Sequence, residues 1–264
     1  MSKVSAIVIV KNGENLIKDC LNSVAFCDEV IVVDSGSNDK TLDIAKNMGA
    51  KVYILESDNF STLRNFGLEK AAGEWVLYVD VDERVSSALQ ESIKYQMLNI
   101  KKEFSAFRIK RKNFYLGSYE WPFIEKIERL FRKDKLKRWE GKLHESPIFD
   151  GEVGILDGFL LHYSHRDLTS MLDKTIKWSE VEAQLRLTAN HPKMSWWRFP
   201  RVMLTAFFDS YIRQGGWKAG TVGIIESIYQ SFSIFITYAR LWEMQNKIKN
   251  HPFDKLRTKV ENEK

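Results

Sequence analysis

The chain has 264 residues, of which 44% are hydrophobic and 28% are charged, and its formal net charge is +5. This length can bury a sizeable core, and the ordinary composition excludes a repeat or low-complexity protein. Two cysteines are too few for a disulfide framework. The apolar stretch at the N-terminus is far shorter than the core of a signal peptide, which predicts a first strand and a cytoplasmic protein.

The positive charge is concentrated toward the C-terminus. Residues 1–100 carry 10 Lys and Arg against 15 Asp and Glu, residues 101–190 carry 18 against 14, and residues 191–264 carry 12 against 6. A basic C-terminal part indicates an anionic partner, such as a phospholipid surface, a lipid-linked acceptor or nucleic acid. A solvated basic face explains the charge equally well.

The first hundred residues alternate between strand and helix patterns. Residues 4–10 form a nearly continuous apolar run, which is typical of a parallel strand buried on both faces. Asp39 and Ser61 are predicted to cap the second and third helices. The alternation implies an α/β fold with an open, mostly parallel sheet flanked by helices. The strands are predicted at 4–10, 29–33, 51–55 and 75–79, and the helices at 14–25, 40–48 and 61–72.

Beyond residue 105 the pattern changes to shorter strands and then to helices. A helix is predicted at 168–189 and ends at Asn190-His191-Pro192. The division predicted is a catalytic domain of residues 1–190 and a helical C-terminal appendage of residues 191–264. The shorter strands are predicted at 106–111, 126–131 and 158–163. We expect them to extend the sheet and to form the side of the site that binds the acceptor.

One segment of the appendage is long enough for a membrane span. Residues 219–239 are apolar at helical spacing, but Glu226, Gln230 and several Ser and Thr residues make the segment amphipathic. An interfacial or packed helix is therefore predicted.

Aromatic and basic side chains are interleaved in the same appendage. Such a mixture suits the headgroup region of a membrane, and core packing between helices is the alternative. We favour the membrane surface. The residues are Trp196, Trp197, Phe199, Phe207, Phe208, Tyr211 and Trp217, with Arg198, Arg201, Arg213 and Lys218.

Asp80 and Asp82 follow the fourth predicted strand, with Val81 between them. Both carboxylates can turn toward the same point beyond the sheet edge, where a hard divalent cation would bridge them to a diphosphate. Such a cation neutralises the charge that develops on a diphosphate leaving group. A solvated turn is the alternative for this motif alone, and its position after an apolar strand favours the metal site.

Two further polar residues are candidates for the same ligand. Asp34 ends the second strand and can accept a hydrogen bond from a nucleoside base, while Gly36 lets the backbone approach closely. A helix-capping loop is the alternative for Asp34. Arg64 precedes the Asp80 strand and can reach a phosphate, with a surface ion pair as its alternative.

Several motifs occur in a fixed order along the chain. They are Ala6 to Asn12, Glu14, Val33 to Ser37, Arg64-Asn65, Ala72 to Trp75 and Asp80 to Glu83. This set resembles family 2 glycosyltransferases of the GT-A fold. The segments 129–132, 143–145, 161–164 and 215–218 are similar to the bacterial lipopolysaccharide core β-glucosyltransferase subgroup. Segment 117–122 departs from that subgroup, which leaves the acceptor and the transferred sugar open.

The resemblance implies an inverting, metal-dependent transfer from a nucleotide-diphospho-sugar, commonly UDP-linked, to a glycolipid or other saccharide acceptor. It implies Glu145 as the general base that deprotonates the acceptor hydroxyl. The rivals for this role are Glu128, Asp150 and Asp157. The other implied positions are Val10, Asn12, Glu14 and Asp34 at the nucleoside, Arg64 at the diphosphate, Asp80 at the ribose and metal, and Asp82 and His144 at Mn²⁺ or Mg²⁺.

Three histidines are predicted to have no ligand role. His162 and His165 are expected to be strand and loop residues, and His191 to end a helix.

Two other functions are alternatives. A nucleotidyltransferase is disfavoured because a single glycine, Gly13, follows the first strand in place of a glycine-rich basic loop. A nucleic-acid-binding protein would use the basic C-terminal part, and its affinity would fall steeply with salt. The resemblance instead predicts no nucleic acid, and a peripheral position on the inner face of the cytoplasmic membrane, because the implied acceptor is embedded there.

Overall fold

The computed structural model of the chain describes residues 2–99, 104–141, 145–165 and 167–246. Internal contacts divide the chain into two compact units. The sheet unit comprises Met1–Phe114 and Phe123–Ser164, and the helical unit comprises Tyr115–Pro122 and His165–Lys264. The helical unit therefore includes the tip of a hairpin from the middle of the chain.

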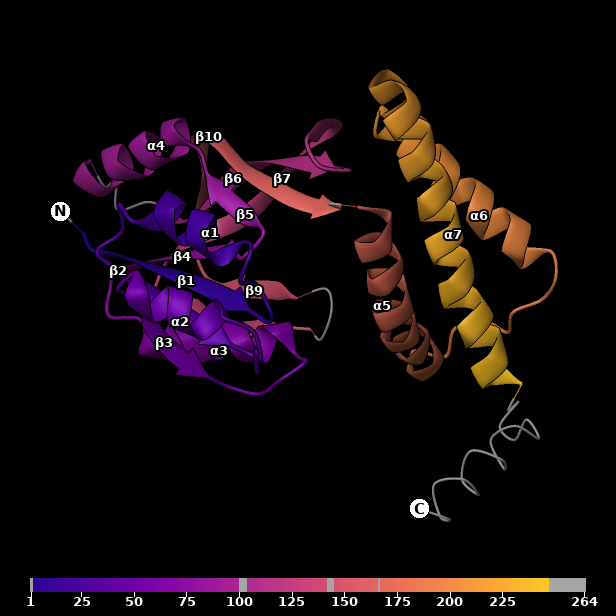
Figure 1. Cartoon of the computed structure of the whole chain (residues 1–264), viewed down its shortest axis with the longest axis horizontal. Helices are drawn as coiled ribbons and strands as arrows, with labels where there is room; N and C mark the ends of the chain where they lie inside the picture. Colours follow the sequence, from indigo (N-terminus) through magenta and orange to yellow (C-terminus); the bar gives the residue numbers. More distant parts are fainter. Residues whose placement is uncertain (1, 100–103, 142–144, 166, 247–264) are drawn as a thin grey trace, which may run out of the picture. The chain divides into compact units, whose positions relative to one another are not determined.

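An eight-stranded sheet forms the centre of the sheet unit (Figure 1). Its strands are β1 (Val4–Val10), β2 (Glu29–Asp34), β3 (Lys51–Ile54), β4 (Trp75–Asp80), β5 (Glu83–Val85), β6 (Phe104–Tyr115), β7 (Tyr119–Arg132) and β10 (Glu152–His165). The order across the sheet is β3-β2-β1-β4-β7-β6-β10-β5. The first four strands are parallel, whereas β7 joins β4 and β5 joins β10 in antiparallel fashion. The predicted α/β class, with a mostly parallel sheet flanked by helices and followed by a helical appendage, is confirmed.

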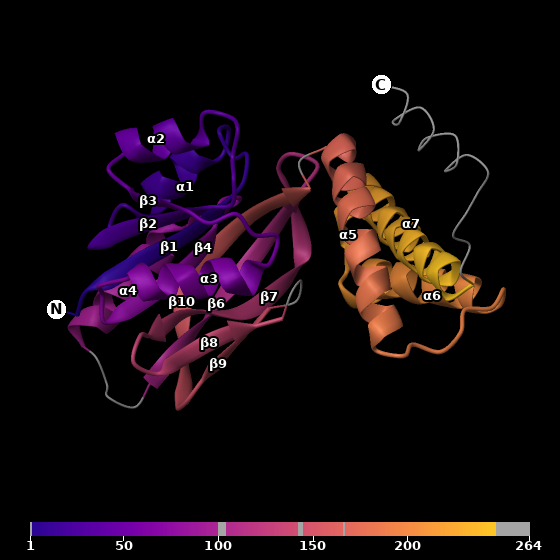
Figure 2. The ribbon, with the colours of Figure 1, turned by 90° about the horizontal axis from the view of Figure 1, so that it is seen from below.

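Helices cover both faces of this sheet (Figure 2). They are α1 (Ile17–Val24), α2 (Thr41–Asn47), α3 (Phe60–Lys70) and α4 (Ser87–Leu98). Successive side chains of a strand point to opposite faces. Ala6 and Val8 of β1 accordingly pack in one core with α1, α2 and α4. Ile7 packs in a second core with α3 and the hairpin formed by β8 (Leu136–Glu140) and β9 (Ser146–Phe149).

The strand register sets the position of two acidic residues. Val10 of β1 is paired with Asp34, and its neighbour Ile9 is paired with Asp80. Since parallel strands end at the same edge of a sheet, Asp34 and Asp80 lie on either side of the carboxyl end of β1. This edge is where α/β sheets bind ligands.

The structure corrects several predicted boundaries. Ser61 does not cap the third helix. Asn59 does so, because its side chain accepts hydrogen bonds from the backbone N–H groups of Ser61 and Thr62. The first helix begins at Ile17 rather than at Glu14, whose side chain accepts a hydrogen bond from the backbone N–H of Lys40 instead. Four elements had no prediction: β5, α4, β8 and β9.

In its described residues, the helical unit has three α-helices: α5 (Leu168–Thr188), α6 (Arg198–Phe208) and α7 (Gly220–Gln245). A π-helical turn (Asp209–Arg213) and a 3₁₀ turn (Gly216–Ala219) connect α6 to α7. The α7 helix packs against both α5 and α6. Gly216 lies beneath the Trp121 ring of the hairpin tip, where an added Cβ would approach the ring to 2.8 Å.

One helical segment among the described residues, Gly216–Gln245, is long and apolar enough to cross a membrane. Its Glu226 and Tyr229 side chains are buried, and the Tyr229 hydroxyl donates a hydrogen bond to the Met171 carbonyl of α5. Arg240 of α7 pairs with the exposed Glu180 of α5 at 3.0 Å. These contacts make α7 a packed helix of the helical unit, which is one of the two predicted alternatives.

Candidate active site

Two arginines hold the carboxylate of Asp80. The Nη2 atom of Arg64 lies 2.8 Å from Oδ1 of Asp80, and the Nη2 atom of Arg129 lies 2.8 Å from Oδ2. Both arginine side chains are buried. Burial by itself raises the pKa of Asp80, but the charges of Arg129 and Arg64 outweigh it and hold that pKa well below its usual range. Asp80 is therefore ionised, with both oxygens bound.

A second buried carboxylate fixes the turn after Asp80. Glu83 is 0% exposed, and its Oε2 atom accepts a hydrogen bond of 2.9 Å from the backbone N–H of Asp80. Its Oε1 atom lies 3.1 Å from Nη1 of Arg111 and 3.6 Å from Nη2 of Arg129. Buried charges are stable only when they are paired, so this network determines the backbone path through the motif.

Arg64 also contacts the candidate base. Its Nε group donates a hydrogen bond of 3.0 Å to Oε1 of Glu145, whose side chain is 14% exposed. The guanidinium lies 4.9 Å from the centre of the Trp139 ring and 5.6 Å from that of Tyr78, within the range of cation–π attraction. One arginine from α3 thus brings Asp80 and Glu145 into a single site.

The residue after Arg64 holds the hairpin that carries Glu145. Nδ2 of Asn65 donates to the Trp139 carbonyl at 3.0 Å, and Oδ1 of Asn65 accepts from the Trp139 backbone N–H at 2.7 Å. Trp139 belongs to β8, which pairs with β9 next to Glu145. This reciprocal pair fixes the hairpin against α3.

The second aspartate of the motif contacts a histidine. Nε2 of His162 lies 3.5 Å from Oδ2 of Asp82, and Nδ1 of His162 lies 2.7 Å from Oδ1 of Asn113. The pairing of β5 with β10 causes this arrangement, because it sets His162 opposite Glu83. The prediction that His162 is only a strand residue missed this contact. No sequence spacing signals it, since the two strands are far apart along the chain.

The pair formed by Asp82 and His162 fits a divalent cation. Carboxylate oxygen and imidazole nitrogen are both ligands of Mn²⁺. The amide oxygen of Asn113 accepts a hydrogen bond from Nδ1 of His162, so the lone pair of Nε2 would be the one available to a cation. No cluster of three or more His, Cys, Asp or Glu side chains suited to a metal occurs in the part of the chain that the structure describes. Two protein ligands are common where substrate phosphates supply the others. His144, also predicted as a ligand, lies outside the described residues.

Asp34 has one bound and one unbound oxygen. Its side chain is 0% exposed, and Oδ1 accepts hydrogen bonds from the backbone N–H groups of Gly36 at 2.9 Å and Ser37 at 2.7 Å. Oδ2 is buried without a hydrogen-bond partner among the described residues. A buried carboxylate oxygen without a partner is costly, so this atom is suited to accept a hydrogen bond from a ligand.

The other predicted nucleoside residues surround the same loop. Oδ1 of Asn12 accepts from the backbone N–H of Asn38 at 3.0 Å, and Oε2 of Glu14 accepts from that of Lys40 at 3.2 Å. Val10 is buried at the end of β1. These residues are brought together with Asp34, and Asn12 and Glu14 shape the loop through their own side chains.

The rival bases have partners elsewhere on the sheet unit. Glu128 pairs with Arg108 at 2.6 Å, and Asp150 pairs with Lys137 at 2.8 Å. Asp157 is 96% exposed. Of the four candidates, Glu145 is the one that contacts the network around Asp80 within the described part of the chain.

Three residues of this network had no predicted role: Arg129, Glu83 and Arg111. The first two nevertheless stand within motifs that carried the family resemblance.

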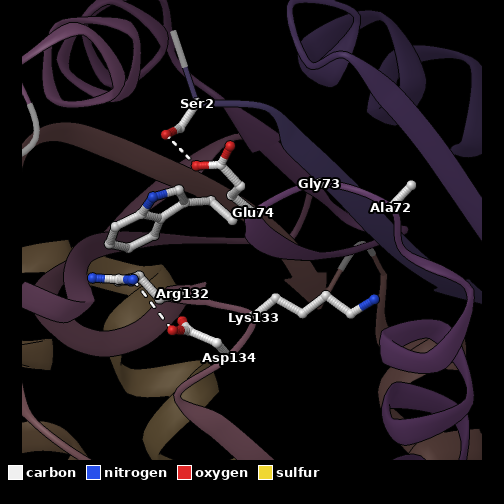
Figure 3. Close-up of a pocket in the computed structure, with 8 residues that line it drawn as sticks. Ser2, Ala72, Gly73, Glu74, Arg132, Lys133 and Asp134 are labelled. Carbon is white, nitrogen blue, oxygen red and sulfur yellow. Dashed lines mark hydrogen bonds and ion pairs between the residues drawn. The ribbon is translucent and has the colours of Figure 1, made fainter.

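A pocket lies at the opposite end of β4 from Asp80 (Figure 3). Its charged side chains already have partners: Ser2 donates to Glu74, and Arg132 pairs with Asp134 at 3.2 Å. The pocket is at the amino end of the parallel strands, away from the edge where the predicted site residues collect. Its lining comprises Ser2, Ala72, Gly73, Glu74, Trp75, Arg132, Lys133 and Asp134.

Comparison with known proteins places these residues in a wider group. The family described as Glycosyl transferase family 2 matches residues 5–148. An uncharacterized glycosyltransferase of Rickettsia typhi (strain ATCC VR-144 / Wilmington) is 30% identical, with 95% of this chain and 90% of that protein covered. The lipopolysaccharide core biosynthesis glycosyltransferase LpsC of Rhizobium meliloti (strain 1021) is 26% identical, with 91% and 92% covered. Among solved structures, S. aureus TarS 1-349 in complex with UDP-GlcNAc is 18% identical with a TM-score of 0.47, covering 94% of this chain and 93% of that chain.

Proposed function

The chain belongs to glycosyl transferase family 2, and from this premise we propose that it transfers a hexose from a UDP-sugar to a saccharide of a cell-envelope glycolipid, with inversion at the anomeric carbon. The observation that supports this proposal most is the double contact of Arg64 with Asp80 and Glu145. It joins the donor motif to a carboxylate that can act as a base. The similarity to a lipopolysaccharide core enzyme supports the class of acceptor.

The donor is proposed to lie along the carboxyl edge of the parallel strands. The unbound Oδ2 of Asp34 would accept a hydrogen bond from the base N–H of the nucleoside. Val10, Asn12 and Glu14 would form the walls beside it. Nη1 of Arg64 is buried without a partner among the described residues, which suits it to donate to a diphosphate oxygen.

Asp82 and His162 would hold Mn²⁺ or Mg²⁺, and His144 is retained as a further proposed ligand. When bound, such a cation neutralises the charge on the departing diphosphate. Both oxygens of Asp80 are bound by arginines. Its proposed contribution is therefore to orient Arg64 and Arg129 and to contact the ribose, and it is not proposed as the sole ligand of the cation.

Glu145 is proposed to take the proton of the acceptor hydroxyl. The acceptor oxygen then forms a bond to the anomeric carbon while the bond from that carbon to the diphosphate oxygen breaks, which inverts the configuration. The hydrogen bond from Arg64 keeps one oxygen of Glu145 in place and leaves Oε2 to face the acceptor. General-base assistance of this kind contributes about 10²–10⁴-fold to the rate.

A panel of nucleotide sugars tests the reaction. Release of UDP should require a divalent cation, and the product formed from an α-linked donor should carry a β linkage by NMR. Absence of nucleotide release from every donor, with and without Mn²⁺ or Mg²⁺, would refute the proposed activity. A retained α linkage would refute inversion while leaving glycosyl transfer intact.

The proposed acceptor class also implies where in the cell the enzyme acts. A glycolipid acceptor lies in a membrane, so we place the enzyme on the inner face of the cytoplasmic membrane as a peripheral protein. The basic C-terminal part is proposed to bind the anionic surface there and not nucleic acid.

A further inference from the structure

The outer face of α6 carries a row of exposed apolar side chains. Leu204 is 58% exposed and Phe208 is 57% exposed, and Ile212 of the following π-helical turn is 54% exposed. These residues follow one another at intervals of four, so they lie along one side of the helix. No residue of α6 is fully buried. The row is therefore a surface feature of the second half of α6 and of the turn that follows it.

Exposed tryptophans stand at both ends of this row. Trp196 is 81% exposed and Trp197 is 45% exposed at the start of α6, and Trp217 is 55% exposed beyond its end. Arg198 lies over the ring of Trp197 at 5.1 Å, and Lys218 lies over that of Trp217 at 5.3 Å. Tryptophan next to a cation is typical of the boundary between lipid headgroups and acyl chains.

The charge of this region is almost entirely positive. Residues 193–219 contain five Lys and Arg residues and a single acidic residue, Asp209, which pairs with Arg213 at 2.6 Å. Arg201 and Lys218 are exposed. A surface of this composition is complementary to a layer of anionic headgroups.

The remaining aromatic residues of this segment pack against neighbouring rings. Phe199 contacts Phe235 of α7, with ring centres 5.9 Å apart, and Phe207 stacks on Tyr211 at 5.3 Å. Phe199 thus takes part in the packing of α6 against α7, and this ring contact does not involve the exposed row. Within the aromatic set, Phe199 therefore supports packing against α7, whereas the exposed Trp196, Trp197, Phe208 and Trp217 support membrane contact.

We propose that one face of α6, together with its flanking residues, docks onto the surface of an anionic phospholipid bilayer. This surface, hereafter the α6 face, comprises Trp196, Trp197, Arg201, Leu204, Phe208, Ile212 and Trp217. The apolar row would enter the headgroup boundary, and the flanking cations would contact lipid phosphates. A second copy of the chain fits less well, because a two-fold contact through this face would bring its positive charges close to their own copies. The inference rests on the proposed function in that the bilayer is where the lipid-linked acceptor is met.

The test uses the full chain and vesicles of phosphatidylcholine with or without phosphatidylglycerol. The protein should sediment with the phosphatidylglycerol vesicles at low salt, largely detach at high salt, and ignore phosphatidylcholine alone. Arg201→Glu should weaken binding about 30-fold at low salt, since it changes two charges at about 1 kcal/mol each. The double substitution Leu204→Ser with Phe208→Ser should weaken binding on the order of tenfold.

Matched controls separate the α6 face from general effects. Ile176→Ser with Leu172→Ser removes two exposed apolar side chains from α5 of the same unit, and Lys18→Glu reverses an exposed charge on α1. Both controls should bind as the unsubstituted protein does. Circular dichroism should show that all variants fold.

Two results would overturn the inference. One is failure of the full chain to bind phosphatidylglycerol vesicles at low salt, and the other is equal loss of binding in the α6 variants and the controls. A change in oligomeric state on Leu204→Ser with Phe208→Ser would assign the face to a second copy instead. Metal-dependent donor hydrolysis in solution should be the same in the α6 variants as in the unsubstituted protein, so a missing hydrolytic activity would count against the proposed function and not against this docking face.

Discussion

Arg64 lies between Asp80 and Glu145, with its Nη2 atom 2.8 Å from Oδ1 of Asp80 and its Nε atom 3.0 Å from Oε1 of Glu145. A single buried cation therefore pairs with both Asp80, which ends β4, and Glu145, which lies on a separate hairpin. The planar guanidinium fixes the direction in which each carboxylate is bound relative to the other. This gives the proposed donor site a physical connection to the proposed base.

Replacement of Arg64 tests how much its ion pairs contribute to the free energy of unfolding. Arg64→Ala leaves the charge of Asp80 half-compensated in a buried site, and it should lower the free energy of unfolding by about 3–5 kcal/mol. Arg132→Ala, which removes an arginine paired with the exposed Asp134, is the matched control and should change stability by less than about 0.5 kcal/mol. Urea unfolding measures both. Equal stability of the two variants would contradict the importance of the pair.

Replacement of the second aspartate tests the metal proposal. Asp82→Asn should fold normally but lose most turnover, because a neutral amide is a weaker ligand for a hard cation. Asp80→Asn should weaken donor binding as well, since it also releases Arg64 and Arg129. Turnover as a function of Mn²⁺ concentration is the measurement. Near-normal turnover of Asp82→Asn at saturating metal would remove Asp82 from the site.

Asn113 offers a milder test of the same centre. Its amide oxygen lies 2.7 Å from Nδ1 of His162 and orients the imidazole. Asn113→Ala should raise the Mn²⁺ concentration for half-maximal activity by about 10–100-fold, the usual effect of removing such a partner, with little change in the maximal rate. An unchanged metal requirement would mean that His162 is not a ligand.

Glu145→Gln tests the base. Transfer should fall by about 10²–10⁴-fold, because the amide cannot accept the proton of the acceptor hydroxyl. The KM for the donor should change little, and the hydrogen bond from Arg64 can persist to the amide oxygen. Asp150→Asn is the control, and normal transfer by Glu145→Gln together with loss in Asp150→Asn would reverse the assignment.

The acid stability of the fold should depend on Glu29 at the start of β2. Burial raises its pKa, but hydrogen bonds from Lys51, Ser5 and the backbone of Ala72 outweigh this and lower the pKa to about 2. Because the pKa of Glu29 is lower in the folded than in the unfolded chain, ionised Glu29 stabilises the fold when the pH is above the unfolded-state pKa of about 4.3. This contribution is lost as the pH falls toward about 2. Glu29→Gln should therefore be less stable than the unsubstituted protein at pH 7 and nearly equal to it near pH 2. Urea unfolding across this range is the measurement, and a difference that stays constant with pH would show that these hydrogen bonds do not favour the ionised carboxylate.

Much of the parallel half of the sheet could be predicted from local patterns. Apolar runs of four to seven residues, each followed by polar residues, marked β1, β2 and β4, and their parallel order follows from the helices between them. The same logic predicted Asp34 and Asp80 at one edge of the sheet. The motif around Asp80 was recognisable because all its residues lie within a few positions of one another.

Partners that are distant along the chain were decided by the tertiary structure. His162 faces Asp82 because β10 pairs with β5 at the far edge of the sheet, and Arg129 reaches Asp80 because β7 lies antiparallel to β4. Antiparallel pairing between distant strands depends on register, and a shift by one residue would turn each of these side chains to the other face. The sequence by itself thus determined the type of sheet, the edge at which Asp34 and Asp80 lie, and the family. The ion-pair network and the exposed side of α6 instead depend on contacts that exist only after the chain has packed.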